Sequence, residues 1–167
     1  DKIIRADKIY RNDKSWLVLR SADKEPPILP PWEYRVDLAD CNEQKLYLSE
    51  IGISITITMA NYVFFEKLHK NNGYIFVTLE NNSEPLYIRN RRAGDVIKTE
   101  GGAKKIKELF IEKKLDHVAK ERVPLLVSGD TVIACMTGLI LDFPSRVAAD
   151  FLVDKNSKKV VAVFKDQ

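Results

Sequence analysis

Alternation of hydrophobic and polar residues predicts short β-strands over the first half of the chain. The clearest segment is 51–58, where Ile51, Ile53, Ile55 and Ile57 alternate with glycine, serine and threonine. A period of two places these isoleucines on one face of a strand, so we expect them to face a core. Weaker strand patterns are found at residues 32–38, 45–48 and 74–79, and a hairpin is expected over residues 3–19 with its turn at 12–14.

Two segments between these strands carry different signals. Residues 25–31 contain four prolines, which cannot donate hydrogen bonds to a β-ladder, so this stretch is expected to be an extended connector. Residues 61–68 fit either a helix or a strand, and both interpretations stay open. A turn at 71–73 separates this segment from the strand expected at 74–79.

The second half of the chain combines strands with one helical pattern. Ile106, Leu109 and Phe110 recur at helical spacing, which predicts a helix over about residues 104–114, with Lys107 and Lys114 on its exposed side. Strands are expected at 86–89, 125–127, 131–136, 151–153 and 160–164, with turns at 128–130 and 154–157. This content predicts an α+β fold of mostly antiparallel short strands, partly barrel-like, with one main basic helix.

The composition is typical of a globular chain that folds without disulfide bonds or a bound metal ion. The 167 residues are 45% hydrophobic, and a chain of this length buries roughly 70% of its unfolded surface. Cys41 and Cys135 have no Cys-x-x-Cys spacing, so they indicate neither a zinc site nor a disulfide framework and fit a reducing cytoplasm. No hydrophobic run reaches the ~18 residues of a membrane span, so no membrane partner is expected. The chain begins with Asp1 rather than methionine, and we expect it to be a piece of a longer protein.

Positive charge is concentrated in one segment. The chain has 27 Lys and Arg residues against 24 Asp and Glu residues, which gives a net charge of +3. Residues 86–122 hold eleven basic and six acidic side chains, whereas the rest of the chain has a net charge of −2. Such a concentration favours a partner with a phosphate backbone. The alternative is a lysine-rich surface helix that binds nothing, and the charge count alone does not separate the two.

Candidate catalytic residues are few. His69 and His117 are the only histidines, and neither has a second ligand at metal-binding spacing. Cys135 stands in a hydrophobic strand pattern, where a small buried residue is a better interpretation than a nucleophile. Gly101-Gly102 precedes the expected helix without the Lys-Ser/Thr ending of a nucleotide-binding loop, which argues against ATP binding. The glycine pair could still hold one phosphate at the helix N-terminus or be an ordinary turn at the helix start, and both stay open.

Arginines cluster at the end of the strand expected at 86–89. Arg89, Arg91 and Arg92 stand just before Gly94 and Asp95. Asp95 could orient one guanidinium and leave the others for phosphate, which the planar guanidinium binds through two parallel hydrogen bonds. The alternative is a surface cluster of ion pairs that contributes little to stability.

Three linked blocks of sequence resemble the C-terminal domain of tRNA(Ile)-lysidine synthases. The first contains Ile-Arg-Asn-Arg-Arg-Ala-Gly-Asp at 88–95, the second is the Lys-Lys-Ile-Lys-Glu-Leu-Phe segment that opens residues 104–114, and the third is Arg-Val-Pro-Leu-Leu at 122–126. The family has similar blocks in the same order, with the last one before a hairpin, and their linkage is more specific than any block alone. The chain departs from the family at Asp116, where a proline is usual, and at residues 134–136, where a tryptophan is frequent.

This resemblance implies a function. Enzymes of the family use ATP to activate the wobble cytidine of an isoleucine tRNA and join lysine to it, so that decoding changes from methionine to isoleucine. That ligase chemistry belongs to an N-terminal domain with a Ser-Gly-Gly-x-Asp-Ser loop, which this sequence lacks. The resemblance implies a tRNA-binding C-terminal domain over residues 84–167, preceded by a β-rich connector and the N-terminal part of the C-terminal region over residues 1–83.

The resemblance also implies partners and site residues. The domain would grip the acceptor stem of tRNA(Ile), as A-form RNA is recognised by shape and backbone, and would adjoin its own catalytic domain in a cytoplasmic enzyme. A homodimer of the parent enzyme is allowed. ATP, magnesium and lysine would serve the catalytic domain, and this chain would need no cofactor, catalytic residue or metal. The RNA-binding candidates are Arg89, Arg91, Arg92, Lys98, Lys104, Lys105, Lys107, Lys114 and Arg122, with Asp95 as an orienting residue and Gly101 and Gly102 as a phosphate-binding turn.

Two other functions remain to be weighed against RNA recognition. One is a non-catalytic scaffold that docks a protein partner, in which the lysines would be solvated and the hydrophobic loops would make the contact. The other is a small hydrolase that uses Cys135 or a pair of aspartates, for which the chain offers a poor set of residues. The dependence of RNA affinity on salt would separate RNA binding from docking.

Overall fold

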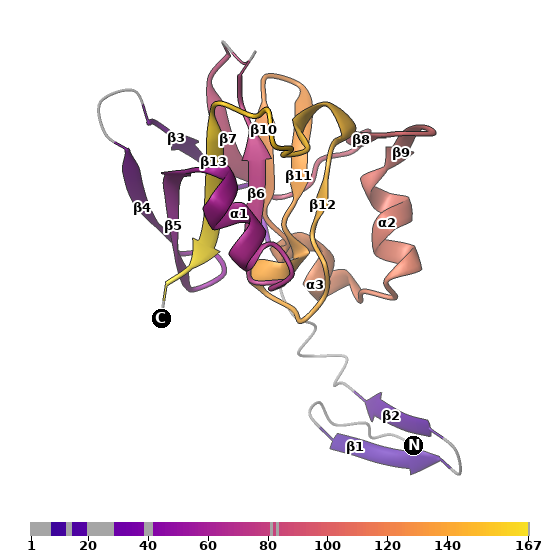
Figure 1. Ribbon diagram of the computed structural model, residues 1–167. Coiled ribbons are helices and arrows are strands. Elements are labelled where there is room, and N and C mark those ends of the chain that lie inside the picture. The colour runs from indigo at the N-terminus through magenta and orange to yellow at the C-terminus, as the bar shows by residue number, and fades with distance from the viewer. Residues whose placement is uncertain are drawn as a thin grey trace.

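The fold is described from a computed structural model (Figure 1). It describes residues 8–12, 15–19, 29–38, 42–80, 82 and 84–166, and for the first two of these ranges the backbone alone. A separate hairpin is formed by β1 (Lys8–Asn12) and β2 (Ser15–Leu19), with Asn12 opposite Ser15. These two strands confirm part of the expected N-terminal hairpin. Its residues 3–7 and 13–14, and the proline-rich connector up to residue 28, lie outside the described residues.

Two sheets form the body of the protein. The larger sheet has the strand order β3-β7-β10-β11-β8-β9, with β12 paired to β11, and the smaller sheet has the order β4-β5-β13-β6. The larger sheet consists of β3 (Glu33–Val36), β7 (Leu86–Arg89), β8 (Val96–Thr99), β9 (Gly102–Lys105), β10 (Leu125–Ser128), β11 (Thr131–Cys135) and β12 (Arg146–Val147). The smaller sheet consists of β4 (Glu43–Leu48), β5 (Ile53–Ala60), β6 (Tyr74–Thr78) and β13 (Val160–Lys165).

The pairing within these sheets is mostly antiparallel. Among the described strands, β8 and β11 form the one parallel pair, with Ile97 opposite Val132. Neither sheet closes into a barrel, so the barrel-like part of the expected fold is not found. What the structure supports is a mixed fold of many short strands and few helices.

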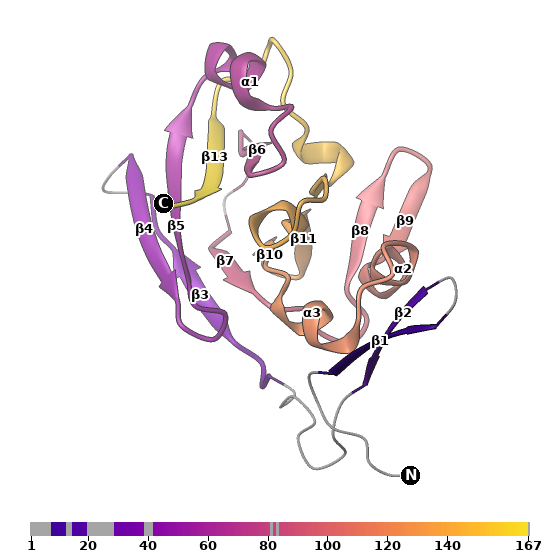
Figure 2. The same ribbon diagram turned by 90° about the horizontal axis from the view of Figure 1, so that it is seen from below.

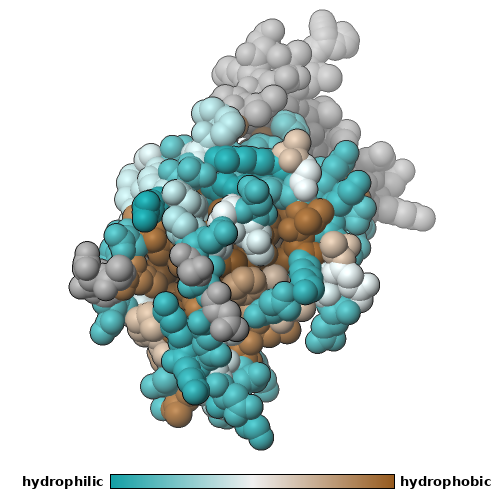
Figure 3. Space-filling view, turned by 90° about the horizontal axis from the view of Figure 1, so that it is seen from above, coloured by the Kyte–Doolittle hydropathy of each residue, from teal (hydrophilic) through white to brown (hydrophobic). Residues whose placement is uncertain are grey.

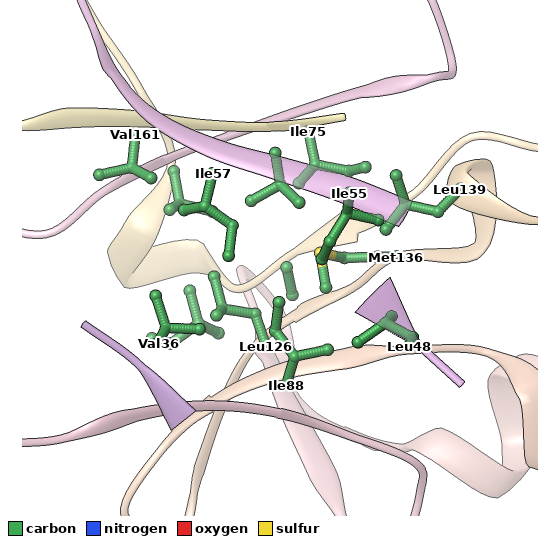
Figure 4. Close-up of a cluster of buried hydrophobic side chains, with 14 of the residues drawn as sticks. Val36, Leu48, Ile55, Ile57, Ile75, Ile88, Leu126, Met136, Leu139 and Val161 are labelled. Atoms are coloured by element: carbon green, nitrogen blue, oxygen red, sulfur yellow. The ribbon is translucent and has the colours of Figure 1, made fainter. Parts of the chain in front are cut away.

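The main core lies between the two sheets. Figure 4 shows its side chains, with Ile55, Ile57 and Val161 from the smaller sheet facing Ile88 and Leu126 from the larger one. Ile55 and Ile57 are 0% and 1% exposed, which confirms the face predicted from the isoleucine alternation. Full burial of each such side chain contributes about 1.5–3 kcal/mol.

Helices cover the outer faces of both sheets (Figure 2). The helical segments are α1 (Tyr62–Leu68), α2 (Ile106–Glu112), α3 (His117–Arg122) and the short 3-10 helices η2 (Thr137–Leu139) and η3 (Ala149–Phe151). α1 packs Phe64, Phe65 and Leu68 against the smaller sheet, whereas α2 packs against the larger sheet through its own buried hydrophobic face. The four layers are therefore helix, sheet, sheet and helix. None of the described helices is long and apolar enough to span a membrane.

Several expected elements differ from the structure. The segment 61–68, left open between helix and strand, is α1, whose first turn is capped by the Asn61 side chain accepting from Phe64 N at 2.8 Å. The strand expected at 151–153 is wrong, because residues 149–151 form η3. The strand expected at 160–164 is found as β13, which lies between β5 and β6.

The expected division at residues 83/84 stays a prediction about sequence organisation. Strands from both sides of that point pair in the structure. β3 pairs with β7 in the larger sheet, and β13 pairs with β5 and β6 in the smaller one.

Candidate nucleic-acid interface

The arginine turn, defined here as residues 89–95, connects β7 to β8 and is organised around Asp95. Arg89 Nη1 donates to Asp95 Oδ2 at 2.8 Å, and Arg89 Nη2 donates to Asp95 Oδ1 at 2.9 Å. The Arg89 guanidinium also donates to the Asn90 carbonyl oxygen at 2.9 Å. The two side chains of the pair are only 6% and 11% exposed.

The burial of Arg89 follows from its place in the sheet. Ile88 faces the core between the sheets, so the next residue of β7 faces the opposite side, where α2 and α3 cover the sheet. The Arg89 guanidinium is enclosed by protein and engaged by Asp95, and its contact with RNA stays a prediction. A buried cation of this kind holds the fold rather than a ligand.

Asp95 joins several parts of the turn. Its carboxylate also accepts from the backbone N–H of Arg92 at 2.7 Å, and its carbonyl oxygen accepts from the N–H of Ile106 at 3.0 Å at the start of α2. Burial tends to raise the pKa of Asp95, but the hydrogen bonds from Arg89 and Arg92 and their positive charges outweigh burial and hold this pKa below its usual value. Asp95 therefore stays ionised and orients Arg89, the turn and the helix start together.

Arg91 and Arg92 are engaged nearer the surface. Arg91 donates through Nε at 3.2 Å and Nη2 at 3.1 Å to Glu121 Oε1 of α3, and its Cζ lies 5.9 Å from the centre of the Phe110 ring. Arg92 Nη2 is 3.1 Å from Glu33 Oε1, with both side chains nearly half exposed. A phosphate could compete for these pairs, because exposed ion pairs contribute only about 0–1 kcal/mol.

Two candidate lysines also have carboxylate partners. Lys98 Nζ of β8 is 2.9 Å from Asp150 Oδ2, and both side chains are 63% exposed. Lys104 of β9 pairs with Glu112 at the end of α2. Five of the nine basic candidates are thus engaged within the protein.

The other four have no ion-pair partner among the described residues: Lys105, Lys107, Lys114 and Arg122. The first three belong to what we call the lysine segment, residues 104–114, and all three are exposed. Arg122 ends α3 and lines a cleft together with Ile53 and Lys165. On the face shown in Figure 3, hydrophilic residues lie around and between smaller hydrophobic areas.

The lysine segment is not the basic helix that the sequence predicts. Lys104 and Lys105 belong to β9, because Lys104 pairs with Ile97 and Lys105 with Val96 of β8. Lys114 follows the helix in a left-handed conformation with φ of 56°. α2 itself holds one lysine and two glutamates. The expected exposed stripe of Lys107 and Lys114 on one helix is therefore corrected to two exposed lysines on different local structures.

The glycine pair also lies elsewhere than expected. Gly101 lies in the turn between β8 and β9, and Gly102 begins β9 with a φ of 130°, which suits glycine. The Thr99 hydroxyl donates to the Gly102 carbonyl oxygen at 2.9 Å across this turn. Because β9 runs from Gly102 to Lys105, the pair does not stand at the N-terminus of α2, where the phosphate site was expected.

Two cations that the site prediction omitted, Lys113 and Arg146, act electrostatically on Glu112. Lys113 follows it directly, and Arg146 belongs to β12. The charges of both lower the pKa of Glu112, after the larger effect of the hydrogen bond from Lys104. The charge count over residues 86–122 included Lys113 among the basic residues. Arg146 carried no signal in the sequence, because it lies outside the basic segment 86–122.

The residues considered for catalysis have no catalytic arrangement. Cys135 is 2% exposed, and burial raises the pKa of its thiol to about 11, so it is protonated at neutral pH and is no nucleophile. His69 is bonded through Nδ1 to the Phe65 carbonyl oxygen at 2.9 Å. His117 is exposed at the start of α3. In the part of the chain that the structure describes, no group of His, Cys, Asp and Glu could hold a metal ion.

Comparison with known proteins identifies the protein family that this chain resembles. Residues 86–161, which include the arginine turn and the lysine segment, match the family model of the TilS substrate C-terminal domain. The resemblance to tRNA(Ile)-lysidine synthases is confirmed. Among solved structures, the chain is similar to a crystal structure of a TilS C-terminal domain, with a TM-score of 0.61 and 21% identity, over 81% of this chain and 96% of that one. This likeness shows the fold.

Individual relatives carry the name of the whole enzyme. The chain is 36% identical over 77 residues to the tRNA(Ile)-lysidine synthase of Geobacillus kaustophilus, covering 45% of this chain and 17% of the relative. It is 34% identical over 99 residues to that of Bacillus subtilis, covering 58% of this chain and 20% of the relative. The chain therefore spans only about a fifth or less of the length of these relatives.

Proposed function

We propose that this chain is the tRNA-recognition part of a tRNA(Ile)-lysidine synthase and that it binds the acceptor stem of tRNA(Ile). The observation that carries the proposal is that four of the nine predicted RNA-binding cations have no carboxylate partner among the described residues, and all four lie in the segment that matches the family model. Lys105, Lys107 and Lys114 are exposed, and Arg122 is partly buried. Unpaired surface cations of this kind gain most from a phosphate backbone.

The mode of recognition follows from the chemistry of these side chains. Ammonium groups on exposed positions bind phosphates as point charges and give affinity without reading bases. An acceptor stem is A-form RNA, whose wide minor groove and backbone a protein reads by shape. The lysine segment would therefore position the stem, while Arg92 could exchange its exposed partner Glu33, and Arg91 its partly buried partner Glu121, for phosphate or ribose hydroxyl groups.

Ligation of lysine would take place in another part of the enzyme. ATP, magnesium and lysine would bind a catalytic domain outside this chain, and that domain would be its protein partner in the cytoplasm. The pure chain, given ATP, lysine and tRNA(Ile), should form no lysidine. Lysidine detected by mass spectrometry of digested tRNA from that reaction would contradict the division of labour.

Salt-dependent binding tests the proposal. The chain should bind tRNA(Ile), and a hairpin copy of its acceptor stem should compete for binding better than a hairpin copy of its anticodon stem. If each of the four unpaired cations neutralises one phosphate, the logarithm of the association constant should fall against that of the salt concentration with a slope of about −3.6. A slope near zero, or equal competition by both hairpins, would favour a protein-docking domain without RNA contact.

A further inference from the structure

A cleft opens between the two sheets at the end where α3 lies. Its volume is about 340 Å³, within the range of about 300–1,000 Å³ of small-molecule sites. Figure 1 shows α3, the C-terminal end of β13 and the turn between β4 and β5 at the same end of the two sheets. The cleft is lined by these elements, by the start of β5 and by the segment that follows η2. The fold, and not one local motif, therefore assembles it.

The walls of the cleft are aliphatic. They consist of six hydrophobic residues that are neither buried nor fully exposed: Ile51, Ile53, Val118, Ala119, Ile140 and Leu141. Single exposed hydrophobic residues are ordinary on a protein surface, whereas a contiguous group of them marks a surface that a ligand or partner covers. These walls therefore favour a ligand with a flat or apolar part.

Two cations line the same cleft. Arg122 ends α3 and Lys165 ends β13, and neither has an ion-pair partner among the described residues. Their acidic neighbours in sequence have other partners, because Glu121 pairs with the arginine turn and Asp166 accepts a hydrogen bond from Thr56. The two cations are therefore available to an anion that enters the cleft.

One carboxylate completes the lining. Asp116 is the N-cap residue of α3, and its Oδ1 accepts from the Ala119 N–H at 2.8 Å. In the part of the chain that the structure describes, its second oxygen has no hydrogen-bond partner, and a carboxylate oxygen accepts readily from hydroxyl groups. Asp116 follows Lys114 by two residues, a reach of at most about 7 Å. The cleft therefore adjoins the lysine segment.

These three kinds of group match the three parts of a ribonucleotide. Aliphatic walls can hold the faces of a base, a cation binds the phosphate, and a carboxylate accepts from ribose hydroxyl groups. Bases in a duplex are stacked and cannot enter a cleft, so the nucleotide must be unpaired. An acceptor stem ends in an unpaired 3′ strand, whose last ribose carries two free hydroxyl groups. Continuity with the lysine segment favours this RNA end over an acidic peptide.

We propose that this cleft binds the unpaired 3′-terminal nucleotide of the tRNA whose acceptor stem the lysine segment holds. This inference rests on the proposed function and extends it from the duplex to the single-stranded end. The aliphatic walls hold the base, Arg122 and Lys165 neutralise its phosphate, and the second oxygen of Asp116 accepts from the terminal ribose. Walls of this kind hold a base by its faces, so the contact adds affinity without selecting among tRNAs.

Two acceptor-stem hairpins test the cleft, one with a four-nucleotide unpaired 3′ extension and one with a blunt end. The wild type should bind the extended hairpin about ten times more tightly. Its salt slope for that hairpin should be steeper by about 0.7, the value for one single-stranded phosphate. Both effects would come from the cleft, because the duplex is the same in the two RNAs.

A matched pair of lysine variants assigns the effect to the cleft. Lys165→Gln should lower the advantage of the extended hairpin severalfold and leave the affinity for the blunt hairpin unchanged. Lys155→Gln removes the same charge at an exposed lysine of the turn before β13, which has no ion-pair partner among the described residues, and should keep the full advantage. Thermal melts establish that both variants are folded.

The terminal ribose is tested through Asp116→Asn, because asparagine caps a helix as well as aspartate does. The wild type should bind an extended hairpin that ends in a 2′,3′-dideoxynucleotide about threefold less tightly than one with the natural end. Asp116→Asn should distinguish the two ends less than the wild type does. An undiminished preference in this variant would contradict the role of the carboxylate.

Failure of this inference and failure of the proposed function give different results. Equal wild-type affinities for the blunt and extended hairpins, with salt-dependent binding of both, would overturn the cleft site and leave the proposed function standing. Equal losses for Lys165→Gln and Lys155→Gln would overturn the cleft site in the same way. Absence of salt-dependent binding of either hairpin by the folded wild type would overturn the proposed function, and this inference with it.

Discussion

The arginine turn and the lysine segment are both rich in positive charge, yet the fold treats them in opposite ways. In the arginine turn, Arg89 and Asp95 share two hydrogen bonds in an environment that is 6% and 11% exposed. In the lysine segment, Lys105 and Lys107 are exposed and have no carboxylate partner among the described residues. Similar charge in the sequence thus serves stability in one region and is available to a ligand in the other. Exposure, rather than charge, separates the two roles.

The largest effect expected from this comparison is on stability. Arg89→Met leaves the Asp95 carboxylate buried without its main partner and should lower the free energy of unfolding by about 3–5 kcal/mol, as measured by urea denaturation. The double variant Arg89→Met, Asp95→Asn should lose less than the sum of the two single substitutions, because the pair acts as one unit. A loss below 1 kcal/mol for Arg89→Met would show that Arg89 is not the structural cation described here.

A second effect concerns acid stability. The pKa of Asp95 lies below its usual 3.8 because, although burial raises it, hydrogen bonds and charges from Arg89 and Arg92 lower it further. The unfolded state therefore binds the proton more readily, so the stabilisation is complete above that usual pKa and is lost as pH falls through the lower folded-state pKa. Asp95→Asn should be less stable than the wild type near neutral pH and should show a flatter decline of stability in acid. Parallel pH curves for the two proteins would contradict this linkage.

A smaller loss in the free energy of unfolding is expected where the ion pairs are more exposed. Arg91→Gln breaks the pair with Glu121, whose side chains are 29% and 20% exposed, and should lower the free energy of unfolding by about 1 kcal/mol. Lys98→Gln breaks a pair whose side chains are both 63% exposed and should change stability by less than about 0.5 kcal/mol. A larger loss of stability for Lys98→Gln than for Arg91→Gln in denaturation curves would contradict the relation between exposure and structural role.

The sequence predicted the elements with strong local patterns. The isoleucine alternation identified the buried face of β5, and the Ser-Gly-Asp turn identified the hairpin of β10 and β11. The sequence predicted that the helix begins at residue 104, because Lys104 and Lys105 are good helix formers. In the structure both residues pair with β8, and this pairing overrides their helix propensity. A hydrophobic pattern with helical spacing does not reveal such competition.

The roles of individual cations were less predictable than the family. Arg89 belongs to a motif that suggests phosphate binding, but its burial depends on α2 and α3 covering the second face of the larger sheet. Arg146 stands far along the chain from Glu112, and its charge lowers the pKa of Glu112 only in the folded protein, in which β12 pairs with β11. The burial of Arg89 and the effect of Arg146 on Glu112 both depend on contacts between segments distant in sequence, which local sequence patterns do not reveal.

The central claim is that the lysine segment binds an RNA backbone, and a matched pair of triple variants tests it most directly. One variant carries Lys105→Gln, Lys107→Gln and Lys114→Gln. The control carries Lys45→Gln, Lys67→Gln and Lys70→Gln, at exposed lysines of β4 and of α1 and the turn that follows it, so that both lose three charges. For tRNA(Ile) binding at several salt concentrations, the first variant should lower the magnitude of the salt slope by about 2.7, while the control stays close to the wild type and both keep the wild-type melting temperature. An equal slope for the two folded variants would contradict the claim.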